Sequence, residues 1–437
     1  MQTTKLDYKK TALIGLAFMT ISAFWQLYNN EVPLMLEEMI GSDRQFVINM
    51  IMSLDNITAL FLLPFFGSLS DRVNTRIGKR MPFIIIGTVV SVVFMLIMPI
   101  AFSKGSLIAF FISVGGLLLS MSFYRSPAVA LMPDVTPKPL RSAGNAVINL
   151  MGAVGLIFIQ FMTIVLGGEK NYAELFTAVA LFMLMSLVVM FFTVDENKLV
   201  AQMPVETETE EERVARENQG IKIAGGERVS LFFLLVSVFL WYMAYSAIET
   251  NYTRYAKDIW GLTDGAYSKP MLFASIVALV SFVPIGVLSN RFGRKKTILG
   301  ALGVLLAAVV ITAFIRGYTP VLYVLFALIG VSWAAINVNS YPMVVEMSRG
   351  ADVGKYTGLY YTFSMAAQIA TPVITGFMFD LFGRIFNISF EILFPYAALF
   401  LFVAIITMIF VRHGEAAPEA EAKSKHDMET VQNNDAE

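Results

Sequence analysis

The chain has 437 residues, of which 57% are hydrophobic and only 15% are charged, and its formal net charge is −1. Soluble domains carry roughly 25% charged residues, so this composition indicates a protein that places most of its surface in lipid. The absence of cysteine excludes disulfides, thiolate metal sites and cysteine nucleophiles. The two histidines lie at the end of the last apolar run and in the polar tail, which excludes an imidazole metal site or a catalytic triad within the membrane.

Twelve apolar runs are long enough to cross a hydrocarbon core of about 30 Å. They predict an all-α polytopic membrane protein. An even number of spans puts both termini on one side, and most Lys and Arg residues fall in the loops on that side, so the positive-inside rule predicts cytoplasmic termini. The predicted spans are residues 11–30, 46–68, 82–102, 106–131, 143–166, 174–194, 229–250, 270–289, 297–315, 320–342, 356–378 and 392–411.

The chain contains an internal repeat. Two loops, beginning at Gly67 and at Gly286, share the pattern Gly-x-x-Ser-(Asp or Asn)-Arg, and each joins two spans. A duplication of this kind in a polytopic membrane protein indicates transport. Residues 206–217 are acid-rich and form either a surface helix or part of a mobile linker. The expected domains are a first six-helix bundle at 1–194, a cytoplasmic linker at 195–228, a second six-helix bundle at 229–413 and a disordered cytoplasmic tail at 414–437.

The first loop also carries a family resemblance. Gly67-x-x-x-Asp71-Arg72 resembles the loop signature of the major facilitator superfamily, and a longer pattern around it resembles the plant-type sucrose:proton symporters and their bacterial relatives. The glycoside-pentoside-hexuronide cation symporters are similar at a greater distance, although Ala59 and Leu63 stand where they carry two aspartates. The residues that fit the sucrose-carrier loop are Pro64, Gly67, Ser70, Asp71, Arg72, Arg76, Gly78, Arg80, Pro82 and Phe83.

This resemblance covers nearly the whole chain and has three implications. It implies two parallel six-helix bundles around a central cavity, which is the major facilitator fold. It implies a sugar as the substrate. It also implies energy coupling through an ion that moves with the sugar, most directly a proton.

Four ionisable residues are singled out, of which three lie inside the predicted spans and Glu31 directly follows the first span. Such groups are costly in a bilayer unless they face a cavity or a partner, so they are the default functional candidates. Asp55, Glu31 and Glu249 are the predicted proton-coupling carboxylates. The alternative for Asp55 is that it is simply hydrated by a water-filled vestibule and has no role in coupling. Arg125 lies near the middle of its span, where it either hydrogen-bonds sugar hydroxyls or forms a structural ion pair near Pro127.

Polar and aromatic side chains at helical spacing indicate a carbohydrate site. Aromatic faces stack on the C–H side of a pyranose and amides bond its hydroxyls. Gln26 and Asn30 share one face of the first span, and similar stripes occur in spans 320–342 and 356–378. Ordinary helix packing is the alternative explanation of these stripes. The predicted substrate-binding residues are Gln26, Asn30, Arg125, Tyr245, Trp333, Asn337, Tyr361 and Gln368.

Charged residues at the predicted cytoplasmic helix ends are typical of a conformational latch. A carboxylate there can hold two bundles together in one state through helix dipoles and arginine pairs, and release them in the other. Retention of positive charge on the cytoplasmic side would explain the basic residues of the loop but not Asp71. The predicted latch residues are Asp71, Arg72, Arg76, Asp134, Arg291 and Glu346.

These patterns together predict a secondary active transporter. The primary hypothesis is proton-coupled symport of a di- or oligosaccharide or a glucoside by alternating access. A proton-coupled exporter of amphipathic molecules is one alternative, which the 25 Met and 36 Phe residues keep open, and a sodium-coupled sugar symporter is another. No catalytic constellation or nucleotide-binding loop is found, so neither an enzyme nor an ATP-driven pump is expected.

The expected partners follow from this hypothesis. They are the sugar, the coupling proton and the lipid bilayer, without nucleic acid, cofactor or metal. We expect a monomer with several membrane passes in the plasma membrane, most simply the inner membrane of a bacterium.

Overall fold

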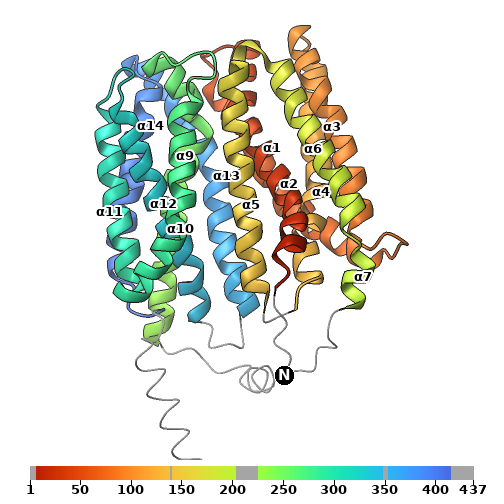
Figure 1. The fold of residues 1–437 in the computed structure, drawn as a ribbon. Coiled ribbons are helices and arrows are strands. Elements are labelled where there is room, and N and C mark those ends of the chain that lie inside the picture. Colours follow the sequence, from red (N-terminus) through yellow and green to blue (C-terminus); the bar gives the residue numbers. More distant parts are fainter. Residues whose placement is uncertain (1–5, 138–139, 203–224, 348–352, 415–437) are drawn as a thin grey trace, which may run out of the picture.

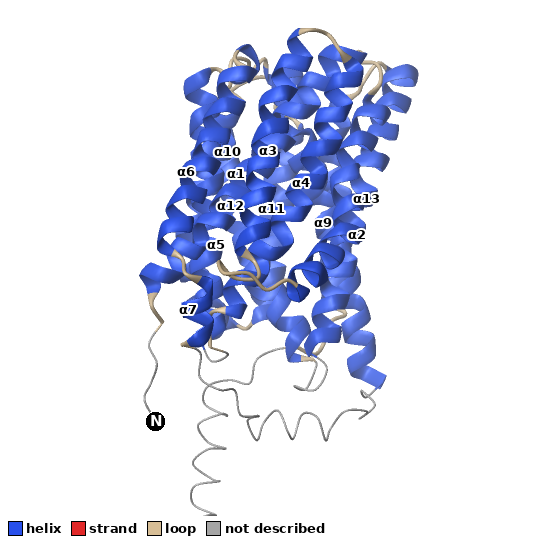
Figure 2. Ribbon diagram, turned by 90° about the vertical axis from the view of Figure 1, so that its right-hand side faces the viewer, coloured by secondary structure: helices blue, strands red, loops and turns tan. Residues whose placement is uncertain are grey.

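The computed structural model describes residues 6–137, 140–202, 225–347 and 353–414, and this part of the chain is helical without strands (Figure 2). Its twelve membrane-length helices confirm the predicted number of spans. The short segments between them are α7 (Glu196–Ala201), η2 (Gly168–Lys170) and η3 (Phe390–Ile392). The long helices are α1 (Tyr8–Ile40), α2 (Gln45–Arg72), α3 (Met81–Ser103), α4 (Leu107–Asp134), α5 (Arg141–Leu166), α6 (Tyr172–Thr193), α9 (Gly225–Trp260), α10 (Ser268–Phe292), α11 (Arg294–Ala313), α12 (Val321–Glu346), α13 (Val353–Phe386) and α14 (Leu393–Ile409).

Three helices extend well beyond their predicted ends. α1 continues to Ile40 rather than ending at 30, α9 continues to Trp260 rather than 250, and α13 continues to Phe386 rather than 378. In α1 and α9, polar residues marked the predicted edge of the membrane. The structure instead buries these residues, for example Glu31 and Asn251, between helices. Polarity at these two positions therefore reflects helix partners and not the end of the span.

Six helices come from each part of the chain. We call α1–α6 the first set and α9–α14 the second set (Figure 1). Within the first set α1 packs along α5 and α3 along α4, and within the second set α9 packs along α14 and α10 along α12. The two sets meet where α2 lies against α13 and α5 against α10. The central linker and tail remain predictions, because residues 203–224 and 415–437 lie outside the described part.

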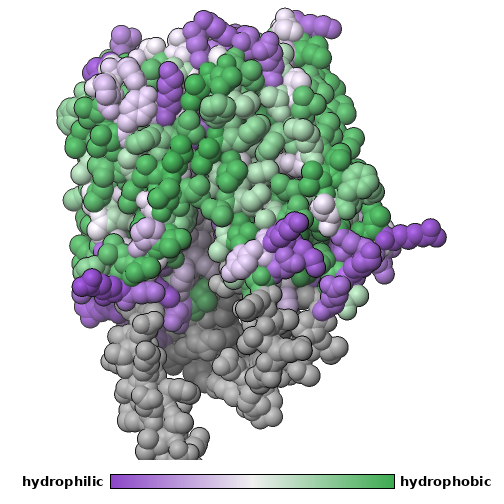
Figure 3. Space-filling model, viewed as in Figure 1, coloured by the Kyte–Doolittle hydropathy of each residue, from purple (hydrophilic) through white to green (hydrophobic). Residues whose placement is uncertain are grey.

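The surface of the protein matches a bilayer environment. On the face shown in Figure 3, apolar side chains form a broad band across the middle, and hydrophilic side chains gather at the two ends. We name these ends by the chain: the terminus side holds the start of α1, and the opposite side holds the end of α1. The assignment of the terminus side to the cytoplasm remains a prediction from the distribution of basic residues.

Two glycines allow close helix contacts. Gly330 of α12 faces the backbone carbonyl oxygen of Ala274 in α10, where an added Cβ would clash. Gly376 of α13 lies against the start of α2, so that a Cβ there would lie 2.8 Å from the carbonyl oxygen of Gln45. The first contact holds two helices of one set together, whereas the second brings the two sets together on the opposite side.

Gly330→Ala should destabilise the fold, because the added methyl group meets a backbone oxygen that cannot move without displacing α10. Overpacking of this kind costs about 1–3 kcal/mol, and we expect a lower midpoint of thermal unfolding in detergent. Gly303→Ala is the matched control, because a Cβ at Gly303 in α11 has open space around it. Equal unfolding midpoints for the two variants would contradict the close α10–α12 contact.

Candidate functional site

Three ionisable side chains from both sets lie within electrostatic range of one another near the middle of their helices. Asp55 of α2 interacts electrostatically with Arg125 of α4 and with Glu249 of α9. All three side chains are half-buried. Asp55 accepts a hydrogen bond from the side-chain amide of Asn56 at 2.8 Å, and Tyr245 is an electrostatic neighbour of Glu249. The structure thus brings together three of the four intramembrane residues singled out from the sequence, and we call them the central cluster.

Arg125 lies in an aromatic and partly open environment. Its guanidinium group lies over the ring of Trp25, 5.6 Å from the centroid, which is within the range of a cation–π contact. Arg125 also interacts electrostatically with Tyr361 of α13, whose side chain is 54% exposed. A residue of the second set therefore lies within electrostatic range of Arg125 while remaining largely exposed.

Two of the three predicted aromatic residues of the second set, Tyr245 and Trp333, form a stack that does not include Tyr361. The rings of Tyr245 and Trp333 are parallel, with centroids 3.7 Å apart, and Tyr242 meets Trp333 edge-on. The amides of Asn337 and Gln368 each donate a hydrogen bond to a carbonyl oxygen of their own helix, at 2.9 Å and 3.2 Å. Their substrate-binding role stays a prediction, and one face of Trp333 is already covered by Tyr245.

Gln26, Asn30 and Glu31 lie in a buried interface that begins one residue after Trp25 and continues toward the end of α1. The Gln26 amide donates to the Asn30 side-chain oxygen at 2.8 Å, and Thr253 of α9 donates to the same oxygen at 3.3 Å. Glu31 is fully buried and accepts a hydrogen bond from the Tyr267 hydroxyl, 2.9 Å from each carboxylate oxygen. In this conformation these predicted residues join the two sets instead of lining an open space.

The sequence prediction overlooked Arg254, a buried ionisable residue of α9. Ending the seventh span at residue 250 placed it in a loop, whereas α9 continues past it to Trp260. The Arg254 side chain is 1% exposed and donates to the side-chain oxygens of Gln45 and Asn49 in α2, the latter at 2.7 Å. The polar and aromatic pattern of α9 runs on without a helix breaker as far as Gly261, and this was the available signal.

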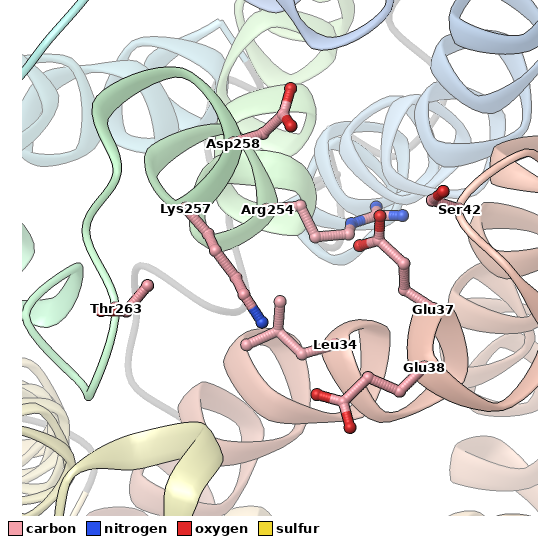
Figure 4. A pocket seen from close by; sticks show the side chains of 8 residues that line it. All are labelled: Leu34, Glu37, Glu38, Ser42, Arg254, Lys257, Asp258 and Thr263. Atoms are coloured by element: carbon pink, nitrogen blue, oxygen red, sulfur yellow. The ribbon is translucent and has the colours of Figure 1, made fainter.

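A charged pocket of about 480 Å³ lies beside Arg254 on the opposite side (Figure 4). One wall comes from α1 and its following loop, and the other comes from α9 and its following loop, so both sets contribute. The lining residues are Leu34, Glu37, Glu38, Ser42, Arg254, Lys257, Asp258 and Thr263.

On the terminus side the charges of the first set form a network around Arg80. Arg80 is buried and bonds to the Asp71 carboxylate, and its Nε donates to Asp134 at 2.8 Å. Lys79 also pairs with Asp134 at 3.0 Å. Glu196 of α7 accepts hydrogen bonds from the backbone N–H groups of Lys79, Arg80 and Met81. The network therefore fixes the α2–α3 loop within the first set.

The ion pairs of this loop involve a different arginine from the two predicted for the latch. Arg72 and Arg76 are exposed and make no ion pair with another described residue, while Arg80, which was not predicted, pairs with both predicted carboxylates. In the second set Arg294 pairs with Glu346 at 3.2 Å, and Arg291 lies over the adjacent ring of Phe292. A role of these residues in holding the sets together in another conformation stays a prediction.

Comparison with known sequences identifies the family. The sequence profile of the Major Facilitator Superfamily matches residues 14–318 and, in a second overlapping match, residues 271–431. The chain belongs to the major facilitator superfamily. No curated protein sequence matches it significantly, and the closer resemblance to the sucrose:proton symporters stays a prediction.

Solved structures show the same fold. A bacterial homologue of the iron transporter ferroportin, in an inward-facing state, is 14% identical with a TM-score of 0.65 over 93% of this chain and 99% of that one. The peptide transporter POT in complex with sulfate is 13% identical with a TM-score of 0.66 over 92% and 93%. A bacterial homologue of the human lysosomal transporter Spinster, inward-facing and unoccupied, is 14% identical with a TM-score of 0.64 over 93% and 95%.

Arg80→Met should destabilise this major facilitator protein, because it removes the donors that Asp71 and Asp134 share. Hydrogen bonds to charged groups contribute about 1.5–3 kcal/mol, so the midpoint of thermal unfolding should fall clearly. Arg72→Met is the matched control, since its side chain is exposed and its midpoint should not change. If Arg72→Met lowered the midpoint as much as Arg80→Met, the charge network would not be centred on Arg80.

Proposed function

We propose that the protein is a secondary active transporter that carries a sugar together with a proton by alternating access. The observation that supports this most is the central cluster, in which Asp55 and Arg125 of the first set meet Glu249 of the second. Ionisable side chains at this depth are costly and mark ion or substrate pathways in membrane proteins. Because the cluster contains residues of both sets, binding of a proton or substrate there can change how the two sets pack against each other.

The charge balance of the central cluster suits coupling to a cation. One guanidinium group and two carboxylates carry a net charge of −1 when all three are ionised. Binding of one proton makes the cluster neutral and lowers the cost of closing the surrounding space, because an unbalanced charge in a poorly hydrated cavity is strongly disfavoured. A sodium ion could balance the same charge, so sodium coupling is the second candidate.

The proposal of a sugar as the substrate is based on the aromatic and amide groups near the cluster. Tyr245 belongs to the Tyr245–Trp333 stack and is also an electrostatic neighbour of Glu249. Asn337 and Gln368 use their amide N–H groups within their own helices, and among the described residues their side-chain oxygens accept no hydrogen bond. Oxygen acceptors beside aromatic rings are suited to a polyhydroxylated molecule.

The conformation fits the inward-open stage of such a cycle. Hydrogen bonds from Arg254, Thr253 and Tyr267 join the sets on the opposite side, while Tyr361 near Arg125 is exposed. We therefore infer a path from the terminus side to the central cluster. With the termini in the cytoplasm, as the basic loops predict, this path opens inward.

Uptake into proteoliposomes tests the proposal. A panel of labelled disaccharides and glucosides is offered with an inward pH gradient, an inward sodium gradient or neither. We expect accumulation of at least one sugar with the pH gradient alone. Accumulation with sodium alone would replace the proton by the second candidate, and absence of sugar transport under all conditions, with export of amphipathic compounds instead, would overturn the proposal.

Asp55→Asn should uncouple sugar transport from proton transport. An amide at this position cannot bind and release a proton as a carboxylate can, so we expect pH-driven accumulation to be lost. Exchange of labelled for unlabelled sugar should continue. Asp195→Asn, which changes an exposed carboxylate outside the spans, should accumulate sugar normally. Concentrative uptake by the Asp55→Asn variant would remove Asp55 from the coupling mechanism.

A further inference from the structure

We propose that Arg254 closes the pathway on the opposite side and thereby positions α2, the helix that carries Asp55. This inference builds on the proposed transport cycle and concerns a residue that the central cluster does not include. Arg254 belongs to the second set. Two of its nitrogens donate across the interface to the first set, to Gln45 at 2.5 Å and to Asn49 at 2.7 Å.

The partners of Arg254 make this contact reversible. All three side chains that accept its hydrogen bonds, Gln45, Asn49 and Asn251, offer neutral amide oxygens. Glu37 acts on the guanidinium group only at a distance, as an electrostatic neighbour. Water can replace a neutral amide more readily than a carboxylate, because no ion pair has to be separated. Arg254 can therefore hold the closed state firmly and still release it.

The pocket beside Arg254 provides the route for that water. Figure 4 shows the side chains of Arg254 and Lys257 reaching from α9 toward α1, whose residues Glu37 and Glu38 line the other side. The Nε of Arg254 is buried and has no hydrogen-bond partner among the described residues. When the sets separate here, the guanidinium group passes into a hydrated space that already contains carboxylates.

A second contact acts on the same end of α2. Asp380 of α13 accepts hydrogen bonds from the backbone N–H groups of Gln45 and Phe46, at 2.9 Å and 3.0 Å. A carboxylate at a helix N-terminus satisfies otherwise unpaired N–H groups and interacts well with the helix dipole. The start of α2 is thus held by α9 and by α13, both from the second set.

The position of Asp55 follows from this arrangement. It lies ten residues after Gln45, which corresponds to about 15 Å along the helix axis. A continuous helix transmits a displacement of its end to this point. Release of Arg254 from Gln45 and Asn49 therefore moves Asp55 relative to Glu249, and the closure of the pathway is linked to the geometry of the central cluster.

Distances between spin labels test this inference. The chain has no native cysteine, so pairs of introduced cysteines need no prior substitutions. Arg44→Cys with Arg384→Cys reports the α2–α13 separation on the opposite side, and Asn74→Cys with Lys355→Cys reports it on the terminus side. These four side chains are exposed. The labelled protein is measured without substrate in lipid nanodiscs.

Arg254→Met should lengthen the 44–384 distance and shorten the 74–355 distance. Loss of a buried charge-assisted hydrogen bond should change the ratio of closed to open populations by about tenfold or more. Arg316→Met is the matched control, because Arg316 lies on the same side and pairs with Glu391 within the second set. It should leave both distances unchanged, and Arg254→Lys should restore part of the closed population.

Asn49→Leu tests the same contact from the other helix and serves if Arg254→Met does not fold. It should shift both distances in the same direction, and the double variant should add little to the Arg254→Met shift, since both remove one interaction. Unchanged distances in a folded Arg254→Met or Asn49→Leu protein would overturn the inference, as would an equal shift in Arg316→Met. The distances are read without substrate, so failure of sugar uptake would contradict the proposed function and leave this test intact.

Discussion

Polar side chains at the depth of a bilayer need partners within the protein or contact with water, because lipid offers neither. This requirement explains where the charged residues of the chain lie. Asp55, Arg125 and Glu249 are half-buried, and the two residues of the first set lie within electrostatic range of the residue of the second set or of each other. Arg254 and Glu31, which are almost fully buried, each make hydrogen bonds across the interface. The sites of interest are therefore the places where the two sets face each other.

The two ends of the molecule use charge differently. On the opposite side, Arg254 and Tyr267 donate hydrogen bonds from one set to the other, and Asp380 accepts one from the start of α2. On the terminus side, Arg80 and Arg294 form their ion pairs within their own sets. α2 contributes to all three sites. Its start accepts hydrogen bonds from Arg254, its interior carries Asp55, and its end lies at the Arg80 network. A change of conformation that moves α2 would reach each of these sites.

Hydrophobic run length was sufficient to predict the twelve spans, because crossing the bilayer requires about 20 apolar residues whatever their helix neighbours are. The rarity of intramembrane charge was sufficient to select Asp55, Arg125 and Glu249 as candidates. Helical periodicity shows which face of a helix is polar, but it does not show which helix lies opposite. Arg254 bonds to a residue 209 positions earlier in the chain, and Arg80 bonds to one 54 positions later. Such partners follow only from the packing of the sets.

Accessibility of one cysteine beside the central cluster tests the account most directly. Tyr361→Cys, in a chain without other cysteines, is exposed to a membrane-impermeant maleimide from one face of the membrane at a time, with tagged termini reporting the orientation. Lys170→Cys and Asn74→Cys are the controls for the opposite side and the terminus side. The account predicts labelling of residue 361 from the terminus side and protection from the opposite side. Labelling only from the opposite side, or from neither, would contradict a pathway that leads from the terminus side to the central cluster.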